Sequence, residues 1–437
     1  MKISQFTIAT EQDDDRNNFL LYNTHTTAFV VLRKDIYMQI FVNRDFSDTQ
    51  CCDQLKKMGF LVDDDFDELL ALEKLRIKGM DDPVQNVTIL TTTECNARCY
   101  YCFEHGIRQY PMTREIADAT VKYIKKNYPE KQLAINWFGG EPLLNFEIIK
   151  YITAQLKESG YEIISHITTN GSLLTKEMID YLQREYSDLS FQITIDEIGA
   201  KYGEVKRYID IAKEKAYGRV VQNITQLLDR HITTNVRLNF APSKIERAKE
   251  IYVELKKAFE GHDMSSLYMY FAPLTLDNDN EIISDFHGHI EHPFLQAVKT
   301  QFDEGFPLYK PRYDETVGMV GAFGLMPNAF SCGMTTKNRI CIDADGTLYK
   351  CHRLSGRKQY ACGTVFDGID TNNDYYKIFR NPIIEDEECK KCSILPICQG
   401  GGCKSQRILY GNKQKCHRIK QIQGKLVNLY YKEVCKK

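Results

Sequence analysis

The cysteines of this chain are placed very unevenly. Three of the fifteen lie at Cys95, Cys99 and Cys102, ten lie in the last 106 of the 437 positions, and none lies between Cys102 and Cys332. In a compartment that keeps thiols reduced, tight groups of cysteine favour metal ligation over disulfides. The sequence therefore predicts one metal-binding segment near position 100 and a second metal-binding region near the C-terminus.

Composition limits where such a protein can act. A content of 43% hydrophobic and 27% charged residues is typical of soluble globular domains, and a net charge of -2 provides no basic field for nucleic acid or an anionic membrane. The N-terminus has no apolar signal region, and no apolar run approaches the ~20 residues that span a bilayer. We expect a cytoplasmic protein with no nucleic-acid or membrane partner.

The middle of the chain alternates strand-like and helix-like segments. Six βα units in series predict a parallel sheet, and six are too few for a closed eight-stranded barrel. We therefore expect an α/β fold with a partial (β/α)6 TIM-like barrel, open on one side, whose chemistry lies at the C-terminal ends of the strands. The expected strands cover residues 86–92, 133–140, 161–171, 189–196, 234–241 and 265–274.

Two further regions flank this barrel. Residues 1–85 contain a hairpin-like pair, 18–23 and 27–32, and then a short strand after Gly59 that leads into a helix with an acidic first turn. Such a small α+β module is either a packing domain or a peptide-docking domain that offers an edge strand and a helix. The predicted domains are 1–85, 86–325 for the barrel and 326–437 for a cysteine-rich domain.

The first cysteine group has the spacing C-x3-C-x2-C directly after the first predicted strand. Three thiolates on one loop can hold three corners of an iron–sulfur cube and leave one iron open to substrate. A zinc site with His105 as fourth ligand is the alternative. With Tyr101 directly before the third cysteine, the loop resembles the signature of the radical S-adenosylmethionine (SAM) superfamily.

The resemblance to this family extends along the barrel. Gly139-Gly140-Glu141-Pro142 is similar to the family's GGEP segment, which holds the methionine amino group; glycines permit close backbone approach, and a carboxylate suits an ammonium group. Family members contact the ribose and the carboxylate of the cofactor from the later strands. The resemblance assigns those contacts to Thr169, Asn170, Asp196, Arg237 and Asn239, although this chain has Asp196-Glu197 where the family often has Asp-Gly.

The C-terminal cysteines resemble the SPASM extension of peptide-modifying radical enzymes, which carries two auxiliary 4Fe-4S clusters. Thirteen residues separate Cys332 from Gly346 and four separate Gly346 from Cys351, while the later cysteines read C-x2-C-x5-C-x4-C, with four residues where the family has three. The resemblance implies two ligand sets. The outer set is Cys389, Cys392, Cys398 and Cys416, and the inner set is Cys332, Cys351 and Cys403 with either Cys341 or an open iron. A zinc ribbon at Cys389 and Cys392 is the alternative for that pair. Cys51, Cys52, Cys362 and Cys435 are expected to be ordinary thiols.

His352 directly follows the expected cluster ligand Cys351, where sulfatase-maturating relatives carry an aspartate base. A histidine there could accept a proton near neutral pH. A hydrogen bond to cluster sulfur or to the backbone is the other role that we weigh for it.

The resemblance implies a function. Family members cleave S-adenosyl-L-methionine at the open iron to a 5'-deoxyadenosyl radical that abstracts a substrate hydrogen. The expected protein is a maturase of ribosomally made precursor peptides (RiPPs) that forms a thioether or C-C crosslink, a net two-electron oxidation. It would bind the leader peptide through a winged-helix-like N-terminal domain, carry three 4Fe-4S clusters, and receive electrons from flavodoxin or ferredoxin. The alternatives are an anaerobic sulfatase-maturating enzyme that makes formylglycine from Cys or Ser, and a noncatalytic metal scaffold.

Overall fold

The computed structural model describes residues 1–241, 244–274, 325–327, 332–400, 403–410 and 419–435. By their contacts the residues form two compact units, which we describe separately. The first unit joins Met1–Asp81 with Phe294–Thr336 and Asn381–Lys437, and the second joins Asp82–Pro293 with Lys337–Arg380. The expected division into three consecutive domains remains a prediction. The contacts divide its third segment, since residues 337–380 belong with the barrel.

The second unit contains a ten-stranded sheet in the order β11-β10-β9-β8-β7-β6-β12-β13-β14-β15. Its first six strands are parallel and coincide with the six that the sequence predicts. The α/β class and the barrel-like parallel sheet are thereby confirmed. These strands are β6 (Asn86–Thr92), β7 (Gln132–Gly139), β8 (Glu162–Thr169), β9 (Asp188–Ile195), β10 (Thr233–Phe240) and β11 (Leu267–Pro273).

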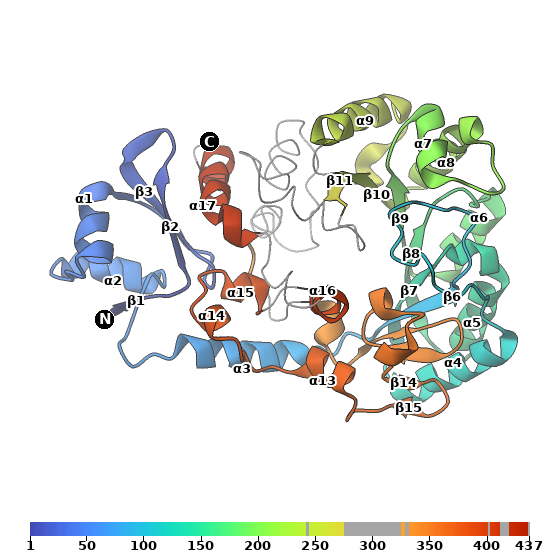
Figure 1. Cartoon of the computed structure of the whole chain (residues 1–437), viewed down its shortest axis with the longest axis horizontal. Coiled ribbons are helices and arrows are strands. Elements are labelled where there is room, and N and C mark those ends of the chain that lie inside the picture. The colour runs from blue at the N-terminus through green and yellow to red at the C-terminus, as the bar shows by residue number, and fades with distance from the viewer. Residues whose placement is uncertain (242–243, 275–324, 328–331, 401–402, 411–418, 436–437) are drawn as a thin grey trace. The chain divides into compact units, whose positions relative to one another are not determined.

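Alternation of side chains gives this sheet two different faces. In β9, Phe191 and Ile193 are fully buried, whereas the intervening Gln192 and Thr194 are half-buried. Helices cover the apolar face, on the outer side of the sheet (Figure 1), and the half-buried polar side chains lie on the other face. The helices of this unit are α4 (Arg114–Asn127), α5 (Phe146–Glu158), α6 (Lys176–Glu185), α7 (Gly199–Lys206), α8 (Lys213–Leu228), α9 (Ile245–Ala258) and α13 (Asp374–Arg380).

The cysteine-rich part of the sequence extends the same sheet. Strand β12 (Arg339–Ile342) pairs parallel with β6, and the shorter β13 (Thr347–Tyr349), β14 (Gly363–Thr364) and β15 (Gly368–Ile369) continue antiparallel. The apolar run Ile340, Cys341 and Ile342 is completely buried, which explains why this segment packs with the barrel.

The first unit contains a three-stranded antiparallel sheet of β2 (Thr7–Gln12), β3 (Asp15–Asn23) and β4 (Phe29–Arg33). The predicted hairpin is confirmed, and so is the short strand β5 (Leu61–Val62), which pairs with β1 (Lys2–Ile3). Asp67 caps the helix that follows, as its side chain accepts a hydrogen bond from the Leu70 amide. The helices of this unit are α1 (Lys34–Tyr37), α2 (Thr49–Lys57), α3 (Glu68–Met80), α14 (Glu387–Lys390), α15 (Leu395–Cys398), α16 (Lys404–Tyr410) and α17 (Ile419–Tyr430).

Trp137, the single tryptophan of the chain, is a probe of the packing of the second unit. Its indole donates a 3.0 Å hydrogen bond to the Tyr186 hydroxyl, which also bonds Thr153, and all three are buried. Tyr186→Phe leaves the buried indole N–H and the Thr153 hydroxyl without this partner, so we expect a loss of about 1–3 kcal/mol of unfolding free energy. Urea unfolding followed by Trp137 fluorescence measures it. Tyr100→Phe, at a 53% exposed position, is the control and should leave stability unchanged.

Within the described residues, no helix is both long and apolar enough to cross a membrane.

Candidate functional site

The predicted metal loop follows β6 at the C-terminal edge of the parallel sheet. Cys95, Cys99 and Cys102 are half-buried, and the Cys102 amide donates to the Cys99 carbonyl at 3.2 Å in a tight turn. Burial raises the pKa of Cys95 to about 12 and that of Cys102 to about 11. Thiols in such surroundings lose their protons on metal binding. No three His, Cys, Asp or Glu side chains of the described residues lie in an arrangement that could hold a metal ion, so ligation remains a prediction.

Gly139 and Gly140 end β7 directly against this loop. A Cβ on Gly139, whose φ is +137°, would lie 2.1 Å from the Thr92 carbonyl oxygen, and one on Gly140 would lie 2.3 Å from that of Glu94. The Gly140 amide donates to Thr92 O at 3.1 Å. These glycines therefore let two backbone segments of the protein meet, in addition to any approach of a ligand.

Glu141 is completely buried beside the loop. Its carboxylate accepts hydrogen bonds from the Thr169 hydroxyl at 2.7 Å and from the amides of Asn170 at 2.8 Å and Leu143 at 3.2 Å. Burial raises the pKa of Glu141 to about 7, although these bonds act in the opposite direction. The structure thus brings three predicted residues together at the ends of β7 and β8. Pro142 begins the 3-10 turn Pro142–Asn145, and the Thr91 hydroxyl donates a hydrogen bond to the Pro142 carbonyl.

Asp196, at the end of β9, lies in a buried polar cluster with the metal loop. Its Oδ2 accepts from the Tyr101 hydroxyl at 2.6 Å and from the Lys206 ammonium at 2.7 Å, and Lys206 also donates to Tyr101 at 2.9 Å. The side chains of Lys206 and Asp196 are 3% and 5% exposed. Burial alone would lower the pKa of Lys206, but the electrostatic effect of Asp196 and Tyr101 is larger, so the pKa of Lys206 lies above its usual value.

Lys206 also supports the metal loop through its backbone. Its carbonyl accepts the Arg98 amide at 2.8 Å and lies 3.8 Å from the Cys99 sulfur. Lys206 did not stand out in the sequence, because a lysine at the end of a short helix is usually solvated.

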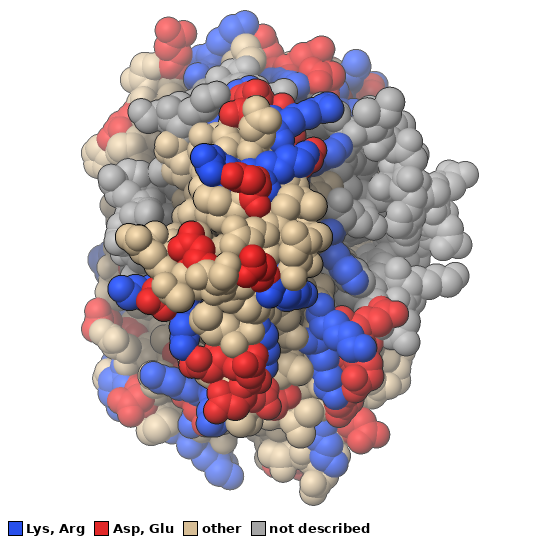
Figure 2. All heavy atoms as spheres, turned by 90° about the vertical axis from the view of Figure 1, so that its left-hand side faces the viewer, with Lys and Arg blue, Asp and Glu red and all other residues tan. Residues whose placement is uncertain are grey.

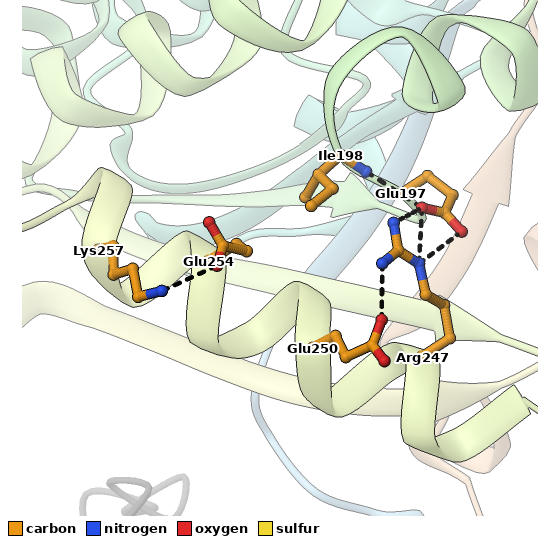
Figure 3. Close-up of polar contacts among 6 residues, drawn as sticks. All are labelled: Glu197, Ile198, Arg247, Glu250, Glu254 and Lys257. Carbon is orange, nitrogen blue, oxygen red and sulfur yellow. Dashed lines mark hydrogen bonds and ion pairs between the residues drawn. The ribbon is translucent and has the colours of Figure 1, made fainter.

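Glu197, where this chain departs from the family pattern, has a structural role. Arg247 of α9 donates to both Glu197 carboxylate oxygens, the shortest contact being 2.6 Å, and also pairs with Glu250 at 2.7 Å (Figure 3). The Ile198 amide adds a longer bond of 3.4 Å to Glu197. This pair fixes the chain directly after Asp196 to the outer helix.

Three predicted residues carry buried polar atoms without a hydrogen-bond partner in the described part of the chain. These atoms are Asp196 Oδ1, Arg237 Nε and Asn239 Oδ1, at or near the ends of β9 and β10. Orphaned buried groups of this kind are costly unless a ligand satisfies them. Together they offer a donor and two acceptors, which fits the hydroxyl and carboxylate groups of S-adenosylmethionine.

Asn96, inside the metal loop, was missed by sequence reasoning. Its amide nitrogen donates to Ser172 at 3.0 Å and to both Asp210 carboxylate oxygens, and its oxygen accepts from Asn170 at 2.8 Å. The loop is thereby held by residues that follow β8 and α7. An asparagine between two cysteines gives no sequence signal of this role.

His352 lies at the same edge of the sheet. Its ring is 4.7 Å from that of Phe138, which precedes Gly139, and 6.1 Å from that of Phe103, both between centroids. Burial, together with Arg353 and Arg237, lowers the pKa of His352 to about 4, so the ring is neutral at pH 7. A neutral imidazole suits both predicted roles, which remain predictions.

The C-terminal cysteines are divided between the two units. Cys341 and Cys351, both buried, belong to the second unit, while Cys332 and Cys403 belong to the first, so the inner ligand set remains a prediction. Cys362, expected to be an ordinary thiol, is buried and donates to the Leu348 carbonyl at 3.3 Å. Of the outer set, Cys389, Cys392 and Cys398 lie in the first unit, and Cys416 lies outside the described residues.

Residues 89–252 match the model of the Radical SAM superfamily. The match covers the metal loop, Glu141 and Asp196, which lie at or directly after the ends of parallel strands, and also Arg237 and Asn239 of β10. The chain is an enzyme with a radical SAM domain.

The chain is similar to known enzymes of this kind. It is 22% identical to the radical SAM cyclopropyl synthase TigE of Paramaledivibacter caminithermalis, over 91% of this chain and 86% of that protein. A probable GTP 3',8-cyclase of Saccharolobus islandicus is 24% identical over 62% of this chain and 83% of its own length.

Two solved structures share the fold. The structure of anSMEcpe with bound AdoMet gives a TM-score of 0.58 at 16% identity and covers 81% of this chain and 97% of its own. Streptococcus suis SuiB bound to S-adenosylmethionine gives 0.53 at 14% identity and covers 92% and 95%.

Proposed function

We propose that this enzyme is a peptide maturase that uses S-adenosylmethionine to form an intramolecular crosslink in a ribosomally made precursor peptide. The observation that carries the proposal is the contact of the metal loop with Asp196 through Tyr101, together with the buried polar atoms of Asp196, Arg237 and Asn239 that have no partner in the described part of the chain. S-adenosylmethionine bound there would supply the radical that abstracts a substrate hydrogen.

The residues present fit that cofactor. Cys95, Cys99 and Cys102 would hold the 4Fe-4S cluster, and Glu141 would orient the strand ends around the methionine group through Thr169 and Asn170. Lys206 and Tyr101 fix one oxygen of Asp196 and leave Oδ1 to accept a bond from the cofactor.

A peptide substrate is supported by the N-terminal sheet. Among the described residues, β4 pairs only with β3, so its other edge can accept an extended peptide strand. Val31 on β4 is 36% exposed, and Met38 and Val42, on the π-helix Met38–Val42 that follows α1, are 40% and 50% exposed. Figure 2 shows one side of the molecule, on which uncharged residues lie between acidic and basic ones. In the related fold, anSMEcpe has been solved with AdoMet and the Kp18Cys peptide, at a TM-score of 0.55.

The likeness to a cyclopropyl synthase along most of the chain favours a carbon–carbon bond over a thioether. In either case the substrate loses two hydrogens: one leaves as a hydrogen atom, and the other leaves as a proton and an electron. SPASM-type auxiliary clusters on the C-terminal cysteines would accept that electron, and flavodoxin or ferredoxin would supply the one needed for cofactor cleavage. The sulfatase-maturating alternative is less favoured, because His352 replaces its aspartate.

The test is an anaerobic incubation of the reconstituted enzyme with S-adenosylmethionine, a reductant and the small peptide encoded beside its gene. We expect the peptide to lose the mass of two hydrogens and to resist fragmentation between two residues. The Cys95→Ala/Cys99→Ala/Cys102→Ala variant is the control and should leave the peptide unchanged. An unmodified peptide despite 5'-deoxyadenosine formation would reject this substrate class and bring sulfatase-type proteins forward.

A further inference from the structure

Arg76, on α3 of the first unit, is a buried arginine whose donors are mostly unused. Arg76 is 4% exposed, and its Nη2 donates a hydrogen bond to the Asn381 carbonyl at 3.3 Å. Its Nε and Nη1 are buried and have no hydrogen-bond partner in the described part of the chain. A guanidinium has five N–H donors, and leaving them unpaired in the interior is costly. Among the described residues, the guanidinium therefore lacks acceptors for these donors.

The groups around Arg76 show what that acceptor could be. Glu73, Cys389 and Cys398 are the ionisable groups that act on the guanidinium electrostatically. Glu73 uses an oxygen to accept the Ile384 amide at 3.2 Å and makes no hydrogen bond to Arg76. The other two of these three ionisable groups are cysteines of the predicted outer cluster set.

The same helix also packs on the segment that carries these cysteines. Leu72 forms one apolar cluster with Phe6, Ile384 and Leu395, and the thiols of Cys389 and Cys392 pack against it. Gly400, two residues after Cys398, lies beside Arg76 Nη1, which a Cβ at this glycine would approach to 4.0 Å. Helix α3 therefore supplies one wall of the cysteine site, and Arg76 is the cation in that wall.

We propose that Arg76 donates hydrogen bonds to a sulfur of the auxiliary iron–sulfur cluster held by Cys389, Cys392 and Cys398, and that it thereby raises the reduction potential of this cluster. The inference rests on the auxiliary clusters of the proposed function. Hydrogen bonds to cluster sulfurs, net charge and burial set such potentials, and a nearby cation favours the more negative, reduced state. Arg76 is a positioning and tuning residue rather than a catalytic one. It links the N-terminal helix to the electron acceptor.

The test uses the full chain with Cys95, Cys99 and Cys102 replaced by alanine, so that the remaining iron belongs to the auxiliary sites. Arg76→Gln and Arg76→Lys are compared in this background with Lys78→Gln, which changes an exposed lysine on the same helix. Iron and sulfide content, circular dichroism and an EPR-monitored redox titration are measured.

We expect Arg76→Gln to lower the potential of one auxiliary cluster. At the wild-type midpoint, the ratio of reduced to oxidised cluster should fall about tenfold, which is about 59 mV for a one-electron couple. Arg76→Lys keeps the positive charge and should lower the potential by a smaller amount. If Arg76→Gln does not fold, the potential of Arg76→Lys is the test, and a potential equal to that of Lys78→Gln would overturn the proposal. Lys78→Gln should match the parent.

Potentials that are the same in Arg76→Gln and Lys78→Gln, with equal iron content, overturn the role of Arg76 and leave the proposed function intact. A parent protein that holds no iron in this background overturns the auxiliary clusters themselves, and with them this inference.

Discussion

Replacing Lys206 by methionine is expected to lower the unfolding free energy of the second unit by about 3–5 kcal/mol, because it leaves the buried Asp196 carboxylate without its counter-ion. Methionine keeps much of the side-chain volume, so a cavity contributes little. The Tyr101 hydroxyl, 2.6 Å from Asp196, cannot replace a charge. Trp137 lies in the same unit, and its fluorescence during urea unfolding measures the loss.

The same variant should bind S-adenosylmethionine more weakly, since the Lys206 ammonium fixes both Asp196 and the Tyr101 hydroxyl. Isothermal titration of the reconstituted protein checks this. Lys201→Met, at an exposed position of the same helix, should affect neither stability nor binding.

A double variant separates charge from packing. Lys206→Met combined with Asp196→Asn removes both charges, so much of the lost stability should return while cofactor binding stays weak. If the double variant is no more stable than Lys206→Met alone, the uncompensated carboxylate is not the cause of the instability.

The parallel strands could be predicted because their signal is local. In β9, Phe191, Ile193 and Ile195 alternate with polar residues, and a period of two specifies a strand wherever it occurs. The meeting of the metal loop, Glu141 and Asp196 followed from topology, since the C-terminal ends of parallel strands lie at one edge.

The residues that support the site could not be predicted, because their signal is not local. Lys206 and Arg76 lie on helices that contain other charged residues, so their burial cannot be read from the sequence. The tertiary fold buries Lys206 beside Asp196 and Arg76 near Cys389. Glu197 similarly depends on Arg247, which is fifty residues further along the chain. The contacts that join residues 337–380 to the barrel unit have no local signal either, because the pairing of β12 with β6 joins segments that are far apart in the sequence.

The second large effect is expected for Gly140→Ala. The new Cβ would lie 2.3 Å from the Glu94 carbonyl oxygen and 2.6 Å from its carbon, and these are backbone atoms that cannot rotate away. The loop that begins at Glu94 must then move, and Cys95 is its next residue. Displacing reacting groups by about 1 Å can cost about 10²-fold in rate, so S-adenosylmethionine cleavage should fall at least that far. Overpacking should also cost about 1–3 kcal/mol of unfolding free energy. Quantifying 5'-deoxyadenosine against bound iron measures the effect.

Gly218→Ala is the matched control, because it makes the same chemical change where there is room. Gly218 lies inside α8, and a Cβ there meets nothing within 4 Å. Alanine favours a helix interior by about 1 kcal/mol over glycine, so this variant should be slightly more stable and fully active. If Gly140→Ala cleaves S-adenosylmethionine as fast as Gly218→Ala does, the contact between this glycine and the Glu94 carbonyl does not position the cysteine loop. The glycine pair would then serve the ligand alone.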